Sequence, residues 1–128
     1  MNMVNKTKDL GDTGEDFAAA YLQEKGYNII ARNFRYGRFA EVDIIAEFDR
    51  TIVFVEVKTR HSDKYGRPAE AVSVVKQNKI IKAAMRFLQV NNYFDRCCRF
   101  DVIEVFANKN KNFKDWKINQ IEDAFYIS

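Results

Sequence analysis

Residue types that often define a functional site are scarce in this chain of 128 residues. Its single histidine, His61, argues against a histidine-rich zinc site and against a Ser-His-Asp triad. The two cysteines, Cys97 and Cys98, are adjacent, which disfavours a structural disulfide, and they lack the spacing of a CxxC metal motif. We expect both to be reduced strand residues of a cytoplasmic protein.

Long apolar runs are also missing. No run approaches the length of a membrane span, and the N-terminus lacks the apolar core of a signal peptide. We therefore expect no membrane contact. The chain shows no internal repeat and no low-complexity tract, so residues 1–128 are predicted to form one domain, with 1–11 as a loose polar tail.

Positive charge is in slight excess, with a net charge of +3, and it is clustered. A solvated basic surface explains any one cluster, whereas several clusters around an acidic site favour a polyanionic partner. The clusters comprise Arg32, Arg35 and Arg38; Lys58, Arg60, Lys64 and Arg67; and Lys76, Lys79 and Lys82.

The hydrophobic pattern predicts a mixed sheet flanked by helices, an α/β fold. Thr13 is predicted to cap the first helix and Gly26 to end it, while Ser73 caps a second helix. The predicted helices span about 13–25 and 73–90, and the predicted strands span 27–34, 41–47, 51–58, 99–107 and 118–127.

The strands at 41–47 and 51–58 carry the most informative pattern. If residues 49 and 50 form a two-residue turn, Asp43 lies opposite Glu56, and Glu41 lies opposite Lys58. Directly opposed side chains have Cβ atoms about 4.5–5.5 Å apart, so two carboxylates there repel unless a cation lies between them. The register therefore predicts a divalent-metal site.

Oxygen ligands favour Mg²⁺ or Mn²⁺ over zinc. Asp43 and Glu56 would supply carboxylates, and the carbonyl of Val57 a further oxygen. Lys58 would orient a water molecule or stabilise charge that develops on a phosphate. Glu15 would approach from the first helix as a third acid.

Asp43 with Glu56-Val57-Lys58 resembles the core of PD-(D/E)xK nucleases. The longer context resembles the bacterial YraN-like family, whose members are described as endonucleases and are similar to archaeal Holliday-junction resolvases. The resemblance to this family covers nearly the whole chain. The sequence departs from the family at residue 40, where Ala40 stands in place of the usual glycine. The matching segments are Gly11-x-x-Gly14-Glu15-x-x-Ala18, Glu41-Val42-Asp43-Ile44-Ile45-Ala46, Phe54-Val55-Glu56-Val57-Lys58-Thr59-Arg60, Arg99-Phe100-Asp101-Val102 and Asp123-Ala124-Phe125.

The resemblance implies a restriction-endonuclease-like core and Mg²⁺- or Mn²⁺-dependent cleavage of DNA, with branched DNA as a substrate. Its implied catalytic residues are Glu15, Asp43, Glu56 and Lys58, with Gln77 as a polar helper for which Lys76 is an equal alternative. The basic residues expected to bind nucleic acid are Arg35, Arg38, Arg60, Lys64, Arg67, Lys76 and Lys79.

Simpler interpretations stay open at this stage. Glu56 and Lys58 can form a surface ion network with Glu41, and Glu15 can simply favour the helix dipole. Asp101 and Glu104 are expected to be surface charges.

An alternative function of a different class is a nucleic-acid-binding module that does not cleave and belongs to a repair, recombination or processing assembly. A further alternative is an interaction protein. Resolution of a four-way junction would require a homodimer, and a protein partner is a further option.

Overall fold

The computed structural model describes residues 10–61, 72–107 and 113–127, which form two helices, one short 3-10 helix and five strands. The predicted tail at 1–9, together with Lys64 and Arg67, lies outside the described residues. The elements in order are α1 (Leu10–Glu24), β1 (Asn28–Tyr36), β2 (Ala40–Phe48), β3 (Thr51–Arg60), α2 (Val74–Val90), β4 (Cys97–Phe106), η1 (Phe113–Asp115) and β5 (Lys117–Phe125).

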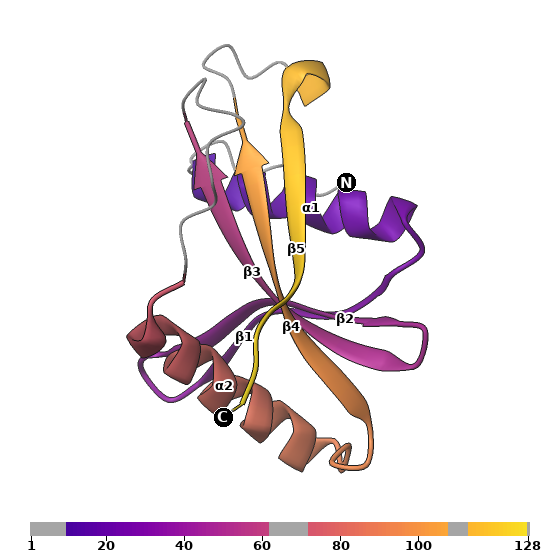
Figure 1. Cartoon of the computed structure of the whole chain (residues 1–128), viewed down its shortest axis with the longest axis vertical. Helices are drawn as coiled ribbons and strands as arrows, with labels where there is room; N and C mark the ends of the chain where they lie inside the picture. Colours follow the sequence, from indigo (N-terminus) through magenta and orange to yellow (C-terminus); the bar gives the residue numbers. More distant parts are fainter. Residues whose placement is uncertain (1–9, 62–71, 108–112, 128) are drawn as a thin grey trace, which may run out of the picture.

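The strands form one sheet in the order β1-β2-β3-β4-β5. Neighbours pair antiparallel except β3 and β4, which run parallel because the chain crosses over through α2 between them. Figure 1 shows the strong twist of this sheet, with α1 near one end of β3, β4 and β5 and α2 near the other. The predicted α/β class, a mixed sheet with flanking helices, is confirmed.

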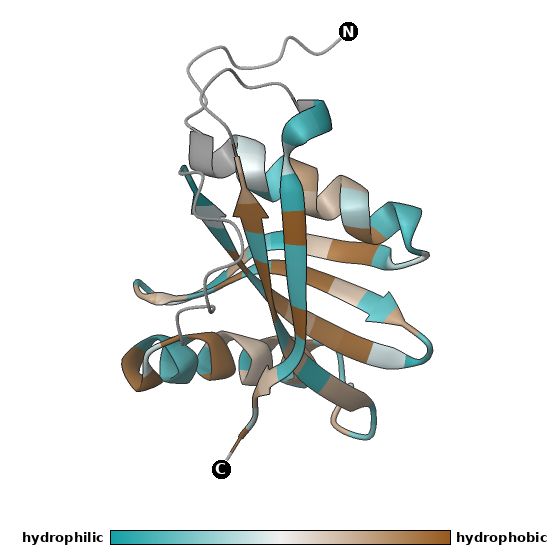
Figure 2. Ribbon diagram, turned by 45° about the horizontal axis from the view of Figure 1, so that its top comes forward, coloured by the Kyte–Doolittle hydropathy of each residue, from teal (hydrophilic) through white to brown (hydrophobic). Residues whose placement is uncertain are grey.

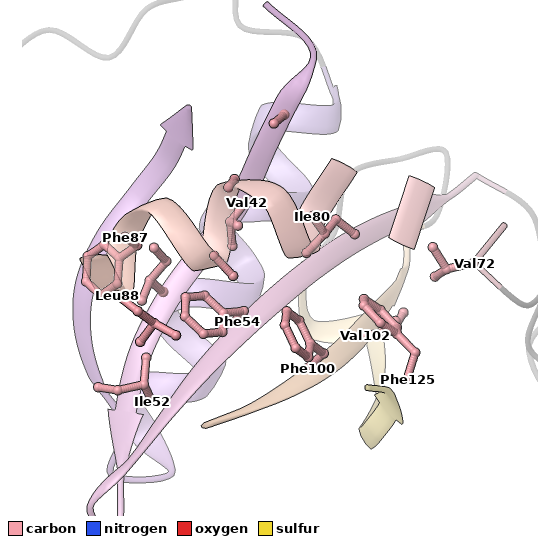
Figure 3. Close-up of a cluster of buried hydrophobic side chains, with 14 residues drawn as sticks. Val42, Ile52, Phe54, Val72, Ile80, Phe87, Leu88, Phe100, Val102 and Phe125 are labelled. Atoms are coloured by element: carbon pink, nitrogen blue, oxygen red, sulfur yellow. The ribbon is translucent and has the colours of Figure 1, made fainter. Parts of the chain in front are cut away.

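Each face of the sheet is covered by one helix. Under α2, the aromatic rings of Phe54, Phe87 and Phe100 form the centre of one core, which Figure 3 shows between the helix and the strands. On the other face, Leu22 of α1 packs with Val53, Val55 and residues of β4. Burial of β3 on both faces explains its continuous apolar run from Ile52 to Val55. Figure 2 shows hydrophobic residues along the strands of the sheet, interrupted by hydrophilic ones. Among the described residues, no helix is long and apolar enough to span a membrane.

The helix boundaries are partly as predicted. Ser73 caps α2, since its hydroxyl accepts a hydrogen bond from the Lys76 backbone N–H at 3.1 Å. The predicted start of α1 is wrong, because the helix begins at Leu10 and Thr13 lies inside it. The helix therefore includes residues 10 and 11, which the sequence pattern had assigned to the tail.

The turn between β2 and β3 consists of Asp49 and Arg50, as predicted. Both have positive φ, 51° and 63°, which is the conformation of a type I′ turn. The register is also confirmed from Phe48↔Thr51 to Ile44↔Val55.

Beyond Ile44↔Val55 the register between β2 and β3 ends, so neither of the predicted backbone pairings, Asp43 with Glu56 and Glu41 with Lys58, forms. The neighbouring pairs Arg32↔Ile44 and Phe34↔Val42 place Asn33 of β1 opposite Asp43. Asn33 has a φ of +55°, outside the strand region.

At this point the alternation of faces breaks. Val42 and Ile45 both lie in the core under α2, three residues apart, whereas Ile44 lies in the core under α1. Strict alternation predicts that Val42 lies on the other face of the sheet from Glu56. This prediction is wrong. The break occurs at Asp43, so this carboxylate lies where β2 separates from β3.

The expectation that Asp101 and Glu104 are surface charges is also wrong. Their exposed fractions are 0% and 2%, because β4 is an interior strand covered on both faces. Each has partners that compensate for burial. Asp101 pairs with Arg99 at 3.0 Å, and Glu104 pairs with Arg60 at 3.1 Å.

Candidate functional site

Asp43 and Glu56 form a buried acidic pair where β2 and β3 diverge. The Val57 backbone N–H donates a hydrogen bond to Asp43 Oδ2 at 2.8 Å, so the side chain of Asp43 takes the place of a backbone partner on β2, whose pairing with β3 has ended at this level. Glu56 is 7% exposed and lies close enough to Asp43 for their carboxyls to hydrogen-bond. The local end of the strand pairing therefore brings the two acids together.

Burial makes ionisation of both acids unfavourable. It raises the pKa of Asp43 to about 7, with a further contribution from the Glu56 carboxylate, while the Val57 N–H acts in the opposite direction. Burial also raises the pKa of Glu56, against the lowering effect of Lys76. Burial and the repulsion between the carboxylates therefore disfavour two negative charges at this pair, and a bound cation would relieve that cost.

Two lysines approach Glu56. Lys76 Nζ, from the first turn of α2, lies 3.7 Å from Glu56 Oε2. Lys58 lies near enough to lower the pKa of Glu56. Of the two residues considered for the helper on α2, Lys76 contacts the acidic pair, whereas the Gln77 amide donates to the Val72 carbonyl at 2.8 Å.

Glu15 reaches the site from α1. Its carboxylate accepts hydrogen bonds from Arg32 Nη2 at 2.9 Å and from Asn33 Nδ2 at 3.1 Å. Burial raises the pKa of Glu15, Arg32 opposes this effect, and the negative charge of Asp43 adds to it. Glu15 therefore lies within electrostatic range of Asp43 and is fixed by β1.

Gly14 allows this approach. A Cβ atom at Gly14 would lie 2.0 Å from Thr59 Oγ1 and 3.1 Å from Thr59 Cβ, so α1 touches β3 at this residue. Only glycine fits such a contact without displacement. The neighbouring Glu15 is thereby held at the end of the sheet where Asp43 lies.

The sequence alone did not identify Arg32 and Asn33 as the residues that hold Glu15. Arg32 was assigned only to a basic cluster. Asn33 offered one signal, since asparagine tolerates positive φ better than most residues and stands inside an otherwise regular strand pattern.

The basic residues proposed for nucleic-acid binding differ in their surroundings. Arg60 is engaged by buried Glu104, and Arg35 Nε lies 3.4 Å from Glu41 Oε2. Arg38 and Lys79 both lie against the ring of Phe39. The contact of these residues with nucleic acid stays a prediction.

The acidic pair suits a hard cation. Mg²⁺ typically takes one or two protein carboxylates and fills its remaining positions with water and substrate phosphate. Asp43 and Glu56 can supply two such carboxylates, and the raised pKa of Asp43 reflects the cost of placing its negative charge in a buried position beside Glu56. Among the described residues, no group of three or more His, Cys, Asp or Glu side chains is arranged to hold a metal ion. Glu15 would then act through water.

Comparison with known families gives one match. The model of a family described as "Uncharacterised protein family UPF0102" matches residues 14–105. A UPF0102 protein of Caldanaerobacter subterraneus subsp. tengcongensis is 46% identical over 98% of this chain and 100% of its own. UPF0102 proteins of Chlorobium phaeobacteroides and Clostridium perfringens are 49% and 40% identical, covering 91% and 98% of this chain and 92% and 100% of theirs.

Among solved structures, the chain is similar to a Holliday junction resolvase of the archaeal hyperthermophile Archaeoglobus fulgidus. The TM-score is 0.43 and the identity 17%, over 86% of this chain and 71% of the resolvase.

Proposed function

The chain belongs to protein family UPF0102, and for this member we propose the activity of a metal-dependent endonuclease that hydrolyses phosphodiester bonds of DNA. The observation that carries the proposal is the buried pair of Asp43 and Glu56 beside Lys58 and Lys76. Two buried acids, whose pKa values burial raises, lie next to two lysines, and together they would provide a binding site for Mg²⁺ or Mn²⁺ and a binding site for phosphate.

Each residue has a distinct part in the proposal. Asp43 and Glu56 would hold the ion, which supplies Lewis-acid chemistry at the scissile phosphate and lowers the pKa of a bound water. The carbonyl of Val57 would add an oxygen ligand. Lys58 would donate to the phosphate oxygens as negative charge develops on them. Glu15, held by Arg32 and Asn33, would orient water on the side of α1.

Lys76 would exchange its partner when the metal ion and the DNA bind. It now neutralises Glu56, and a divalent ion would take over that role. The released ammonium would then contact the phosphate. Gln77 remains a candidate helper one residue further along α2.

Branched DNA is the substrate class we propose to test first. Symmetrical cleavage of a four-way junction needs two active sites, and a two-fold dimer provides them. This part of the proposal rests on the sequence resemblance to resolvases.

A second function is favoured by one contact of the same site. Lys76 Nζ lies 3.7 Å from Glu56 Oε2 and balances its negative charge without a metal ion. A chain of this kind can bind DNA through its basic residues without cleaving it, as a module of a larger assembly. Divalent metal would then be irrelevant to binding.

A cleavage assay separates the two functions. The purified protein is incubated with a four-way junction, a flap, a single strand and a plain duplex, with Mg²⁺, with Mn²⁺ or with chelator. Glu56→Ala is the control against contaminating nuclease. Metal-dependent cleavage that the variant loses supports the endonuclease. Salt-sensitive binding without cleavage supports the binding module.

A further inference from the structure

A hollow of about 510 Å³ lies between the turn that joins β1 to β2 and the exposed side of α2. It is lined by Tyr36, Gly37, Arg38, Phe39, Ala40, Val75, Asn78, Lys79 and Lys82. These lining residues include three cations and two aromatic side chains, and none of them is acidic. Neither aromatic residue takes part in the proposed chemistry at Asp43.

The aromatic rings of the hollow are unusually open to solvent. Phe39 is 70% exposed and Tyr36 is 47% exposed, although large aromatic side chains normally bury most of their surface. Cations lie against both rings. Lys79 Nζ is 5.6 Å and the Arg38 guanidinium 5.8 Å from the centre of Phe39, and the Arg86 guanidinium is 5.6 Å from the centre of Tyr36.

The side of α2 that faces this turn carries residues at a regular helical spacing. Val75, Lys79, Lys82 and Arg86 are spaced by four, three and four residues, so they share one face of the helix. All four are exposed. Figure 2 shows the mixture of hydrophobic and hydrophilic residues on α2. The face combines positive charge with flat apolar surface.

The hollow adjoins the acidic pair along two elements. On α2, Lys76 contacts Glu56, and Lys79 lies three residues later, a rise of about 4.5 Å. On β2, Ala40 lines the hollow and Asp43 follows three residues later, about 10 Å along the strand. A ligand that extends over about 10 Å can therefore occupy both places.

We propose that this hollow binds an unpaired nucleotide of the DNA substrate, whose base stacks on Phe39 while Lys79, Lys82 and Arg38 hold the adjacent phosphates. Sites that bind single strands combine a positively charged groove with exposed aromatic rings on which bases stack. The inference deepens the proposed function, on which it rests, by assigning an unpaired segment beside the cleaved bond.

The contacts explain how a base would enter. In the free protein Arg38 and Lys79 lie near the Phe39 ring, a weak interaction at an exposed position. A base offers a larger flat surface and can replace them, and each displaced cation then meets a phosphate. Bases inside a duplex are stacked on one another, so they cannot make this contact without leaving the helix.

Binding in the presence of chelator tests the inference without any cleavage. Fluorescence anisotropy measures the affinity for a short oligothymidylate, for the same backbone with abasic sugars, and for a duplex of equal length. Phe39→Ala is expected to weaken oligothymidylate binding about tenfold, and to change abasic and duplex binding less than about twofold. Phe39→Trp should retain or improve the affinity.

Phe94→Ala is the matched control, because Phe94 is also an exposed aromatic residue, 57% exposed, beyond the other end of α2. Its affinities should equal those of the wild type. If Phe39→Ala leaves oligothymidylate binding unchanged, or weakens abasic and oligothymidylate binding equally, the hollow does not stack bases and the proposal is overturned. Tight binding of poly-glutamate that Phe39→Ala abolishes, without binding of oligothymidylate, would assign the hollow to an acidic protein and also overturn it.

The hollow and the proposed function can fail separately. Failure of the wild-type protein to cleave any substrate with metal counts against the endonuclease, whereas base-dependent binding in chelator depends only on the hollow. If cleavage occurs, Phe39→Ala should reduce cleavage of a flap more than cleavage of plain duplex.

Discussion

Asp43 has two roles at the scale of single residues. It completes the hydrogen bonding of β3 through the Val57 N–H, and it places an acid beside Glu56. An asparagine would keep the first role, since its carbonyl oxygen also accepts a hydrogen bond, but it would lose the negative charge. Substitutions at this residue can therefore separate structure from chemistry.

The first prediction concerns stability and pH. The folded protein raises the pKa of Asp43 from 3.8 to about 7, so the folded state binds this proton more tightly than the unfolded state. In chelator, the Asp43 contribution to stability should fall as pH rises from about 4 to about 7. Asp43→Asn has no such proton and should gain stability relative to wild type over this window.

Urea unfolding of both proteins across this range measures the effect. The difference in unfolding free energy between variant and wild type should grow with pH and level off above about pH 7. A difference that stays constant over the whole range would show that Asp43 ionises normally in the folded protein.

The second prediction concerns catalysis. Asp43→Asn and Glu56→Gln should each abolish metal-dependent cleavage, while DNA binding in chelator stays equal or becomes tighter because a negative charge near the phosphates is lost. Lys58→Ala should slow cleavage with a modest loss of binding. Single-turnover cleavage and anisotropy on the same preparations test this. Full cleavage by Glu56→Gln would rule out the assignment of the site.

Sequence reasoning predicted that Asp43 and Glu56 lie close together, and the structure brings them together. The two-residue turn and the alternation of strand side chains led to this prediction, although the register that they fix ends at Ile44↔Val55, just before Asp43. The assignment of these residues and Lys58 to a functional site stays a prediction. The positions of Arg32 and Asn33 against Glu15 were not predictable, because they depend on how α1 lies on β1. Local patterns carry no information about that contact.

At the scale of elements, α1 is positioned by the close contact between Gly14 and Thr59. A methyl carbon added at residue 14 would meet Thr59 Oγ1 at 2.0 Å and the Cβ and Cγ2 atoms of Thr59 at 3.1 and 3.2 Å, so the Thr59 side chain or the helix has to shift. This geometry leads to the third prediction.

Gly14→Ala should destabilise the protein by about 1–3 kcal/mol, the usual cost of overpacking. Alanine favours helix formation by up to about 1 kcal/mol relative to glycine, which is too little to offset the clash. Thr59→Ala should restore most of the loss in the double variant, because it removes two of the three atoms. Thermal unfolding of the four proteins forms a double-mutant cycle, and additive effects would contradict the contact.

The turn between β2 and β3 gives the fourth prediction. Arg50 has a φ of +63°, which costs a non-glycine residue about 1–2 kcal/mol. Arg50→Gly should therefore stabilise the protein by about 0.5–1 kcal/mol after the entropic cost of glycine is subtracted. Arg50→Ala is the matched control and should give no gain. Equal stability of the two variants would contradict the assigned turn conformation.

Among the elements, α2 and the hairpin were predictable from sequence, since Ser73 provides a cap and the strands carry a clear apolar pattern. The change of faces at Asp43 was not, because the strand pattern predicts strict alternation; it occurs at the level where Asn33 on the neighbouring strand adopts positive φ. The burial of Asp101 and Glu104 was also missed, because alternation on β4 does not reveal that both faces are covered.

At the scale of the whole molecule, the two helices cover opposite faces of one sheet and each contributes to the same site on it. α1 brings Glu15 and α2 brings Lys76, while the sheet supplies Asp43 and Glu56. Cleavage of a four-way junction would further require two such sites. A dimer with one acidic pair in each subunit is therefore the assembly that the proposed function needs.

Metal binding by the acidic pair is best tested by calorimetric titration of Mn²⁺ into the wild-type protein and into Asp43→Asn near pH 6, in buffers of different ionisation enthalpy. Because the pKa of Asp43 is raised to about 7, metal binding should expel its proton. We expect binding by the wild type with release of about one proton, and weak or absent binding without proton release by Asp43→Asn. Equal binding of Mn²⁺ by both proteins, or binding by neither, would contradict the claim that the acidic pair is a metal site.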